Sequence, residues 1–164
     1  MRARAGLGLA LVAALAALAA CGGDSPTEVV FQVIEDTEFA ASLGIDLAEF
    51  TELPEGVWIR DVTVGAGDAF VAGGDATMNY TGWLSNGTEF DSDDGYTFPN
   101  PFGRPISGLE IGLDGTLVDG VRVMIIPADL AYGAQGAVNP NTGVVVIPGG
   151  AIVIFEVELV ALTD

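Results

Sequence analysis

Short runs of apolar residues, separated by glycine-rich and polar turns, dominate the chain from Val57 onward. Runs of this length with turn residues between them are typical of β-strands rather than of long helices. The pattern predicts five strands, over residues 57–64, 76–84, 88–92, 121–126 and 151–162. The dipeptide Asn86-Gly87, between the second and third strands, predicts a hairpin with a two-residue turn.

Two further segments separate these strands. Residues 105–115 predict one short helix, and residues 133–150 predict a long loop rich in glycine. No internal repeat is visible, and no second helical pattern lies between the strands. The sequence therefore predicts an α+β domain of about 110 residues, built from antiparallel strands and one short helix.

The segment before the strands has a different pattern. Residues 37–44 and 46–50 each predict a short helical turn, the first with Thr37 as N-cap and Gly44 as its stop. Four apolar side chains would share one face of these turns: Phe39, Leu43, Leu47 and Phe50. We expect this face to pack on the domain; the alternative is a surface that binds a partner. Residues 53–56, Leu-Pro-Glu-Gly, then mark the start of the domain.

The N-terminus combines arginines at positions 2 and 4 with an apolar run from Ala5 to Ala20. The run is too short and too rich in alanine to span a bilayer well, and it predicts a secretory signal. Residues 18–21, Leu-Ala-Ala-Cys, resemble the signal of bacterial lipoproteins, in which the signal is removed and the cysteine carries the lipid. The alternative is an ordinary signal peptide followed by a chance cysteine.

This resemblance implies three parts of the chain. Residues 1–20 would be a cleaved signal peptide, residues 21–50 a lipidated tether with a short extension, and residues 51–164 the folded domain. Cys21 would be the lipidation site. Since Gly22 is not the aspartate that retains some lipoproteins at the inner membrane, we expect anchoring to the outer membrane, facing the periplasm of the bacterial cell envelope.

Composition excludes several kinds of site. The formal net charge is −18, all five basic residues are arginines, and such a surface repels nucleic acid. The chain has no histidine, which removes the commonest general base and metal ligand. With a single cysteine it can form neither an intrachain disulfide nor a cysteine-based zinc site.

Five motifs follow one another between residues 57 and 162. They are YTGWLSNGTEFDS at 80–92, YTFP at 96–99, PISGLEIGL at 105–113, PADLAYGAQG at 127–136 and IPGGAIVIFEVELV at 147–160. Each is similar to a segment of the FKBP-type peptidyl-prolyl isomerases, and they occur in that family's order. The resemblance implies a strongly bent antiparallel β-sheet wrapped around one short α-helix, and rotation of the peptide bond before proline.

This reaction suits a chain without histidine. The X-Pro bond rotates slowly because resonance holds it planar, with a barrier of about 18–20 kcal/mol. A dry aromatic pocket that favours the twisted, less polar state needs no nucleophile, cofactor or metal. The resemblance therefore implies a peptidyl-prolyl cis-trans isomerase without a cofactor.

The resemblance assigns three catalytic residues, Asp91, Tyr132 and Phe155. Asp91 would orient Tyr80 and polarise the site near the twisting carbonyl. The Tyr132 hydroxyl would donate a hydrogen bond to a substrate carbonyl, and Phe155 would line the proline slot. Without the motifs, Asp91 could equally be a turn cap and Phe155 a core residue.

Substrate-binding roles are implied for six side chains: Tyr80, Phe90, Phe98, Ile106, Leu109 and Ile147. Leu109 would form the floor of the slot, where the family most often has tryptophan. The backbone N–H of Ile106 would donate to the substrate, and Ile147 would flank the residue before proline. Tyr96 replaces the first phenylalanine of a family pair, and the loop 136–146 is longer than in small family members.

The main hypothesis is a monomeric isomerase that assists the folding of periplasmic and envelope proteins by acting on proline-containing polypeptides, held at the membrane through lipid on Cys21. A second hypothesis is a proline-segment binding module or chaperone with weak turnover. A third is a structural lipoprotein with a vestigial pocket, which the aspartate among the aromatic residues argues against.

Overall fold

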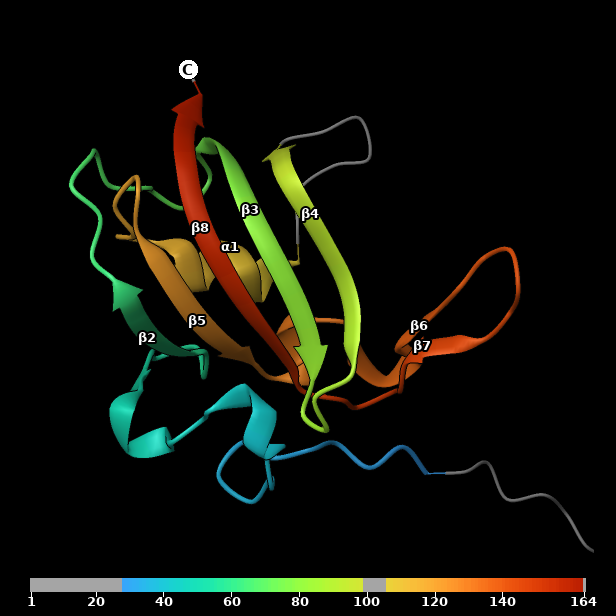
Figure 1. Ribbon diagram of the computed structural model, residues 1–164. Coiled ribbons are helices and arrows are strands. Elements are labelled where there is room, and N and C mark those ends of the chain that lie inside the picture. The colour runs from blue at the N-terminus through green and yellow to red at the C-terminus, as the bar shows by residue number, and fades with distance from the viewer. Residues whose placement is uncertain (1–27, 99–105, 164) are drawn as a thin grey trace, which may run out of the picture.

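The structure is a computed structural model of the 164-residue chain and describes residues 28–98 and 106–163. A six-stranded antiparallel sheet, in the order β1-β2-β5-β8-β3-β4, curves around one short helix, α1 (Ser107–Leu113) (Figure 1). Its strands are β1 (Thr51–Glu52), β2 (Trp58–Thr63), β3 (Asp75–Leu84), β4 (Glu89–Phe98), β5 (Val121–Ile126) and β8 (Val153–Thr163). The predicted α+β fold is confirmed.

Strand β4 is longer than the sequence predicts, because it continues to Phe98 rather than ending at Ser92. Asp93, Asp94 and Gly95 are poor strand formers, but pairing with β3 overrides this preference. The register shifts in this part of the ladder, and the Asn79 side chain accepts a hydrogen bond from the Gly95 N–H at 2.8 Å. Tertiary pairing thus sets the length of β4.

Four residues, 85–88, separate β3 from β4, and the hydrogen bond between Leu84 and Thr88 encloses three of them, Ser85 to Gly87, so the predicted two-residue turn is wrong. The Leu84 N–H donates to the Thr88 carbonyl at 2.8 Å, which closes the loop. Gly87 has a φ of 84°, whereas Asn86 lies outside the left-handed region. A two-residue type I′ turn needs both residues there, so one left-handed glycine selects the longer loop.

The predicted loop 133–150 contains a second, two-stranded sheet of β6 (Ala137–Val138) and β7 (Val145–Ile147). Two 3-10 turns precede it, η3 (Ala128–Leu130) and η4 (Gly133–Gln135). This loop therefore contains regular secondary structure, and it projects beside β4 (Figure 1).

The main core lies between the concave face of the sheet and α1. Two glycines bring the helix backbone onto β5: a Cβ at Gly108 would lie 2.2 Å from Ile126 Cγ2, and one at Gly112 would lie 2.4 Å from Met124 Sδ. Arg122 of β5 donates to the carbonyls of Gly112 and Asp114, at 2.9 and 3.0 Å, and so caps the end of α1. The two glycines thus set the distance between α1 and β5, and Arg122 fixes the C-terminal end of the helix.

A second core covers the convex face. Buried residues of the extension and of the sheet meet there: Ile34, Phe50, Val123, Ile125, Ile152 and Ile154. The extension passes along one end of the sheet to β2 and forms the turns η1 (Ala41–Leu43) and η2 (Leu47–Glu49) (Figure 1). Phe39, Leu43 and Leu47 pack against this cluster, which confirms that the extension packs on the domain.

The caps of these turns agree with the sequence only in part. Gly44 ends the first turn in the left-handed conformation, with a φ of 57°, as predicted. Thr37 is not its N-cap: Ala40 holds that position, and the Thr37 hydroxyl donates to the Val33 carbonyl at 2.6 Å. The turn starts later because its first hydrogen bond runs from Leu43 to Ala40.

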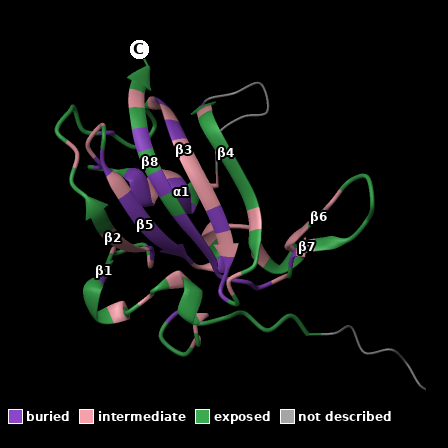
Figure 2. Ribbon diagram, in the orientation of Figure 1, coloured by how far each residue is buried: buried purple, intermediate pink, exposed green. Residues whose placement is uncertain are grey.

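Figure 2 shows that the buried residues gather on α1, β3, β5 and β8, whereas β4 is mostly exposed. Within residues 28–98 and 106–163, no helix is long and apolar enough to cross a membrane. The predicted signal peptide and Cys21 lie outside the described residues.

Candidate active site

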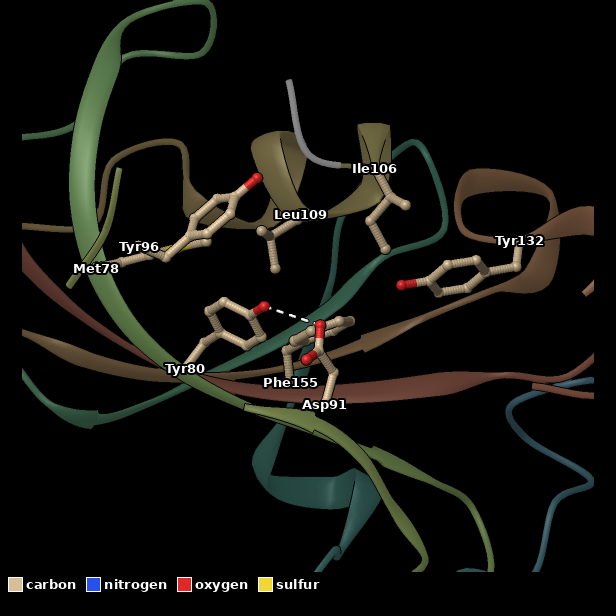
Figure 3. A pocket seen from close by; sticks show the side chains of 8 residues that line it. All are labelled: Met78, Tyr80, Asp91, Tyr96, Ile106, Leu109, Tyr132 and Phe155. Atoms are coloured by element: carbon tan, nitrogen blue, oxygen red, sulfur yellow. Dashed lines mark hydrogen bonds between the residues drawn. The ribbon is translucent and has the colours of Figure 1, made fainter. Parts of the chain in front are cut away.

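A pocket of about 110 Å³ opens on the concave side of the sheet, at the start of α1 (Figure 3). Strands β3, β4 and β8, the beginning of α1 and the segment after β5 each contribute to it. The lining residues are Met78, Tyr80, Asp91, Tyr96, Ile106, Leu109, Tyr132 and Phe155. Residues far apart in the sequence are thus brought together by the bend of the sheet.

One wall carries a hydrogen bond between two side chains. The Tyr80 hydroxyl donates to Asp91 Oδ2 at 2.8 Å (Figure 3). Burial, together with this hydrogen bond and the negative charge of Asp91, raises the pKa of Tyr80. The hydroxyl therefore stays protonated and holds the carboxylate at the edge of the pocket.

The base of the pocket is aromatic. Phe155, only 4% exposed, has its ring centroid 5.8 Å from that of Tyr80 and 5.5 Å from that of Phe90. Gly82 makes room for these rings, because a Cβ there would lie 2.7 Å from Phe90 and 2.9 Å from Phe155. An apolar surface of this kind excludes water from whatever enters the pocket.

Tyr132 stands across the pocket from the Tyr80–Asp91 pair, and its hydroxyl points inward (Figure 3). It makes no hydrogen bond with the other seven lining residues, so the hydroxyl could donate to a group inside the pocket. Burial, and then the charge of Asp91, raises the pKa of Tyr132, which keeps the donor protonated.

Six of the site residues predicted from the sequence surround this single pocket: Tyr80, Asp91, Ile106, Leu109, Tyr132 and Phe155. Leu109, 2% exposed, and Ile106 both approach it from the start of α1 (Figure 3). Their roles toward a substrate stay predictions, but the arrangement that these roles require is present.

Three predicted pocket residues do not line the pocket. Phe98 is fully buried in the core, with its ring 5.7 Å from that of Phe70. Ile147 is 2% exposed and pairs with Ala137 in the small sheet. Phe90 is in edge contact with two lining residues, Phe155 and Tyr132. Phe90 and Phe98 instead pack against lining residues, and Ile147 belongs to the main core.

Two lining residues were missed by sequence reasoning, Met78 and Tyr96. Strand alternation offered a signal for both, since Met78 and Tyr80 stand two apart on β3 and Tyr96 and Phe98 two apart on β4. Tyr96 reaches the pocket and packs edge-on against Tyr80, at 5.5 Å between ring centroids. Phe98, the next residue on that face of β4, lies in the core rather than at the pocket.

No metal site accompanies the pocket in the described part of the chain, where no group of three or more histidine, cysteine, aspartate or glutamate side chains could hold an ion. The lining therefore offers an apolar aromatic surface, a carboxylate at one edge of the pocket and a hydroxyl donor on the opposite side.

Comparisons with known proteins agree on one family. The family model described as FKBP-type peptidyl-prolyl cis-trans isomerase matches residues 67–160. An FK506-binding protein of Neisseria meningitidis serogroup B is 40% identical over 113 residues, which cover 66% of this chain and 98% of that protein. Peptidyl-prolyl cis-trans isomerase FKBP2 of Mus musculus is 42% identical over 89 residues, 52% of this chain and 59% of that protein.

Solved structures show the same likeness. The crystal structure of AtFKBP13 superimposes with a TM-score of 0.61 at 34% identity, covering 70% of this chain and 99% of that one. A peptidyl-prolyl cis-trans isomerase from Pseudomonas syringae gives a TM-score of 0.61 at 28% identity, over 71% and 82% of the two chains.

Proposed function

Because the chain belongs to the FKBP-type peptidyl-prolyl cis-trans isomerases, we propose that it twists X-Pro bonds in the pocket of Figure 3 and thereby assists the folding of envelope proteins. As a member of this family it is an enzyme that acts on proline-containing substrates. One observation carries the proposed mechanism: the apolar aromatic surface of Phe155 lies between the carboxylate of Asp91, which Tyr80 holds in place, and the inward-pointing hydroxyl of Tyr132.

The proline ring would rest on Phe155, beside the edge-packed rings of Tyr80 and Tyr96. In the planar state the amide is polar and well hydrated; in the twisted state the prolyl nitrogen has lost conjugation and is less polar. A water-excluding pocket therefore favours the twisted state and lowers the barrier of about 18–20 kcal/mol.

Hydrogen bonds would hold the peptide on either side of the rotating bond. The Tyr132 hydroxyl would donate to one substrate carbonyl and the Ile106 N–H to another, and Asp91 would polarise the site near the carbonyl that turns. Fixing the flanking atoms while one bond turns is catalysis by positioning.

The direct test uses the fragment Asp24–Asp164, made without lipid, and tetrapeptides that contain an X-Pro bond. We expect faster cis-to-trans conversion than in buffer, in proportion to enzyme concentration. If conversion stays at the uncatalysed rate with every tetrapeptide while the fragment binds proline-containing peptides, the binding-module hypothesis replaces the enzymatic one.

Activity should vary little between pH 6 and 8. The chain has no histidine, and the pKa values of the pocket tyrosines Tyr80 and Tyr132 are shifted upward, away from this range.

Because tyrosines of the unfolded chain ionise near pH about 10, the same shifts predict that stability falls as the pH rises above about 10. A sigmoidal pH–rate profile in a folded fragment would instead indicate a titrating acid at the site, with Asp91 examined first.

Leu109 is the lining residue that keeps the weak-turnover alternative open, because it is smaller than the tryptophan that the family most often has at this position. Leu109→Trp should hold or raise kcat/KM if neighbouring side chains move aside, while overpacking would cost about 1–3 kcal/mol of stability. Leu109→Phe serves as an intermediate size. A tenfold fall in kcat/KM without loss of stability would show that the leucine floor is itself adapted to the substrate.

We further propose that residues 1–20 are removed, that Cys21 carries lipid, and that residues 51–164 work at the outer membrane, facing the periplasm. The support is the Leu-Ala-Ala-Cys sequence at residues 18–21 and the position of the single cysteine. Cys21→Ser should leave the domain folded and active but move it from the membrane to the soluble fraction. An unmodified Cys21 at the mature N-terminus, seen by mass spectrometry, would contradict the anchor.

A further inference from the structure

Gln32, in the extension, binds two separate loops of the domain. Its N–H donates to the Gly150 carbonyl at 2.9 Å, and its Oε1 accepts from the Ile152 N–H at 2.8 Å. Its Nε2 donates to the Ser85 hydroxyl in the β3–β4 turn at 3.2 Å. Two of these hydrogen bonds hold the segment that leads into β8, one through the backbone and one through the side chain, and the third holds the β3–β4 turn.

That segment is in turn bonded to the loop that carries Tyr132. The Gly150 N–H donates to the Gly133 carbonyl at 2.9 Å, so Gly150 is held by Gln32 on one side and by the neighbour of Tyr132 on the other. The two backbones touch, because a Cβ at Gly149 would lie 2.1 Å from the Ala134 carbonyl oxygen. A shift of the 148–152 segment must therefore move residues 132–136 as well.

We propose that Gln32 is a positioning residue: its side chain fixes the 148–152 segment at Ile152, and this segment in turn holds the Tyr132 hydroxyl at its place in the pocket through Gly150 and Gly133. The N-terminal extension would then contribute to catalysis from the far side of the domain. This inference rests on the proposed role of Tyr132 as a hydrogen-bond donor to the substrate.

Other parts of the extension make a different kind of contact. Leu47 packs on the convex face, against the second core, and makes no hydrogen bond to the segment 148–152. Its loss should lower stability alone. Gln32 and Leu47 thus form a matched pair for separating the positioning of the site from the stability of the fold.

The first experiment compares three variants of the fragment Asp24–Asp164 by kcat/KM and by melting temperature. Gln32→Leu, similar in size but without polar atoms, should lower kcat/KM by about two- to tenfold, the effect of losing a net hydrogen bond. Gln32→Glu should recover most of it, because a carboxylate can accept from both the Ile152 N–H and the Ser85 hydroxyl. Leu47→Ala should lower the melting temperature and leave kcat/KM unchanged.

A double-mutant cycle then tests the connection to Tyr132. Tyr132→Phe should lower kcat/KM, and adding Gln32→Leu to it should lower kcat/KM little further, because the hydroxyl that Gln32 positions is gone. Additive losses, or a Gln32→Leu variant that is less stable but fully active, would overturn the proposal. Full activity of Tyr132→Phe itself would instead reject the role of that hydroxyl, and this outcome is distinct because the single variants are measured separately.

Discussion

Phe155→Ala is expected to remove most of the isomerase activity and to lower the free energy of unfolding by about 3–5 kcal/mol. Phe155 lines the pocket and is in ring contact with Tyr80 and Phe90, so its loss removes the aromatic surface on which the proline ring is proposed to rest. Water would enter the space, and the pocket would no longer favour the less polar twisted bond. Tetrapeptide kinetics and urea unfolding measure the two effects.

Leu159→Ala is the matched control for this change. Leu159 lies on the same strand and in the same core, is fully buried, and does not line the pocket. It should lose a similar stability, about 2–5 kcal/mol, while keeping its kcat/KM under conditions in which it is folded. A Phe155→Ala protein that loses stability yet turns over at the wild-type rate would refute desolvation by the aromatic base.

A fragment that begins at Thr51 should be far less stable than Asp24–Asp164. Without the extension, four buried side chains of the convex face become exposed: Val123, Ile125, Ile152 and Ile154. Burial of a large aliphatic or aromatic side chain stabilises by about 1.5–3 kcal/mol, and Ile34 and Phe50 of the extension are buried too. Since domains are stable by only about 5–15 kcal/mol in total, the shorter fragment should unfold or aggregate at room temperature.

Circular dichroism melting and size-exclusion chromatography compare the two fragments. Equal melting temperatures would show that residues 28–50 are a dispensable tether, and they would also weaken the case for Gln32. A low melting temperature would show instead that the functional unit starts before residue 51, where the sequence pattern alone marks the boundary.

The elements that sequence reasoning located best are those whose local preferences agree with their surroundings. Strand β5 runs over residues 121–126 as predicted, because its β-branched residues are buried on both faces by α1 and the extension. The end of β4 was missed, since Asp93, Asp94 and Gly95 oppose a strand locally and only the partner β3 imposes one. No window of sequence contains that partner.

Sequence reasoning was likewise only partly right about the residues of the site. Tyr80, Asp91 and Phe155 were identified by the family motifs, and the structure brings them together around one pocket. Phe98 was assigned to the pocket and Tyr96 was not, although they stand two residues apart on one strand. Tyr96 pairs with Met78, which lines the pocket, whereas Phe98 pairs with Ala76, which does not, and this pairing between strands cannot be read from spacing along one strand.

The two edges of the six-stranded sheet bear on the proposed role in protein folding. An open edge strand offers unpaired backbone groups to any extended polypeptide and can seed aggregation. Here β1 is only two residues long, and the ten-residue β4 carries Glu89, Asp93 and Asp94 exposed along it. One edge is too short and the other too strongly charged to recruit a further strand. In the proposed folding role, both edges would therefore disfavour the addition of a strand from a partly folded substrate.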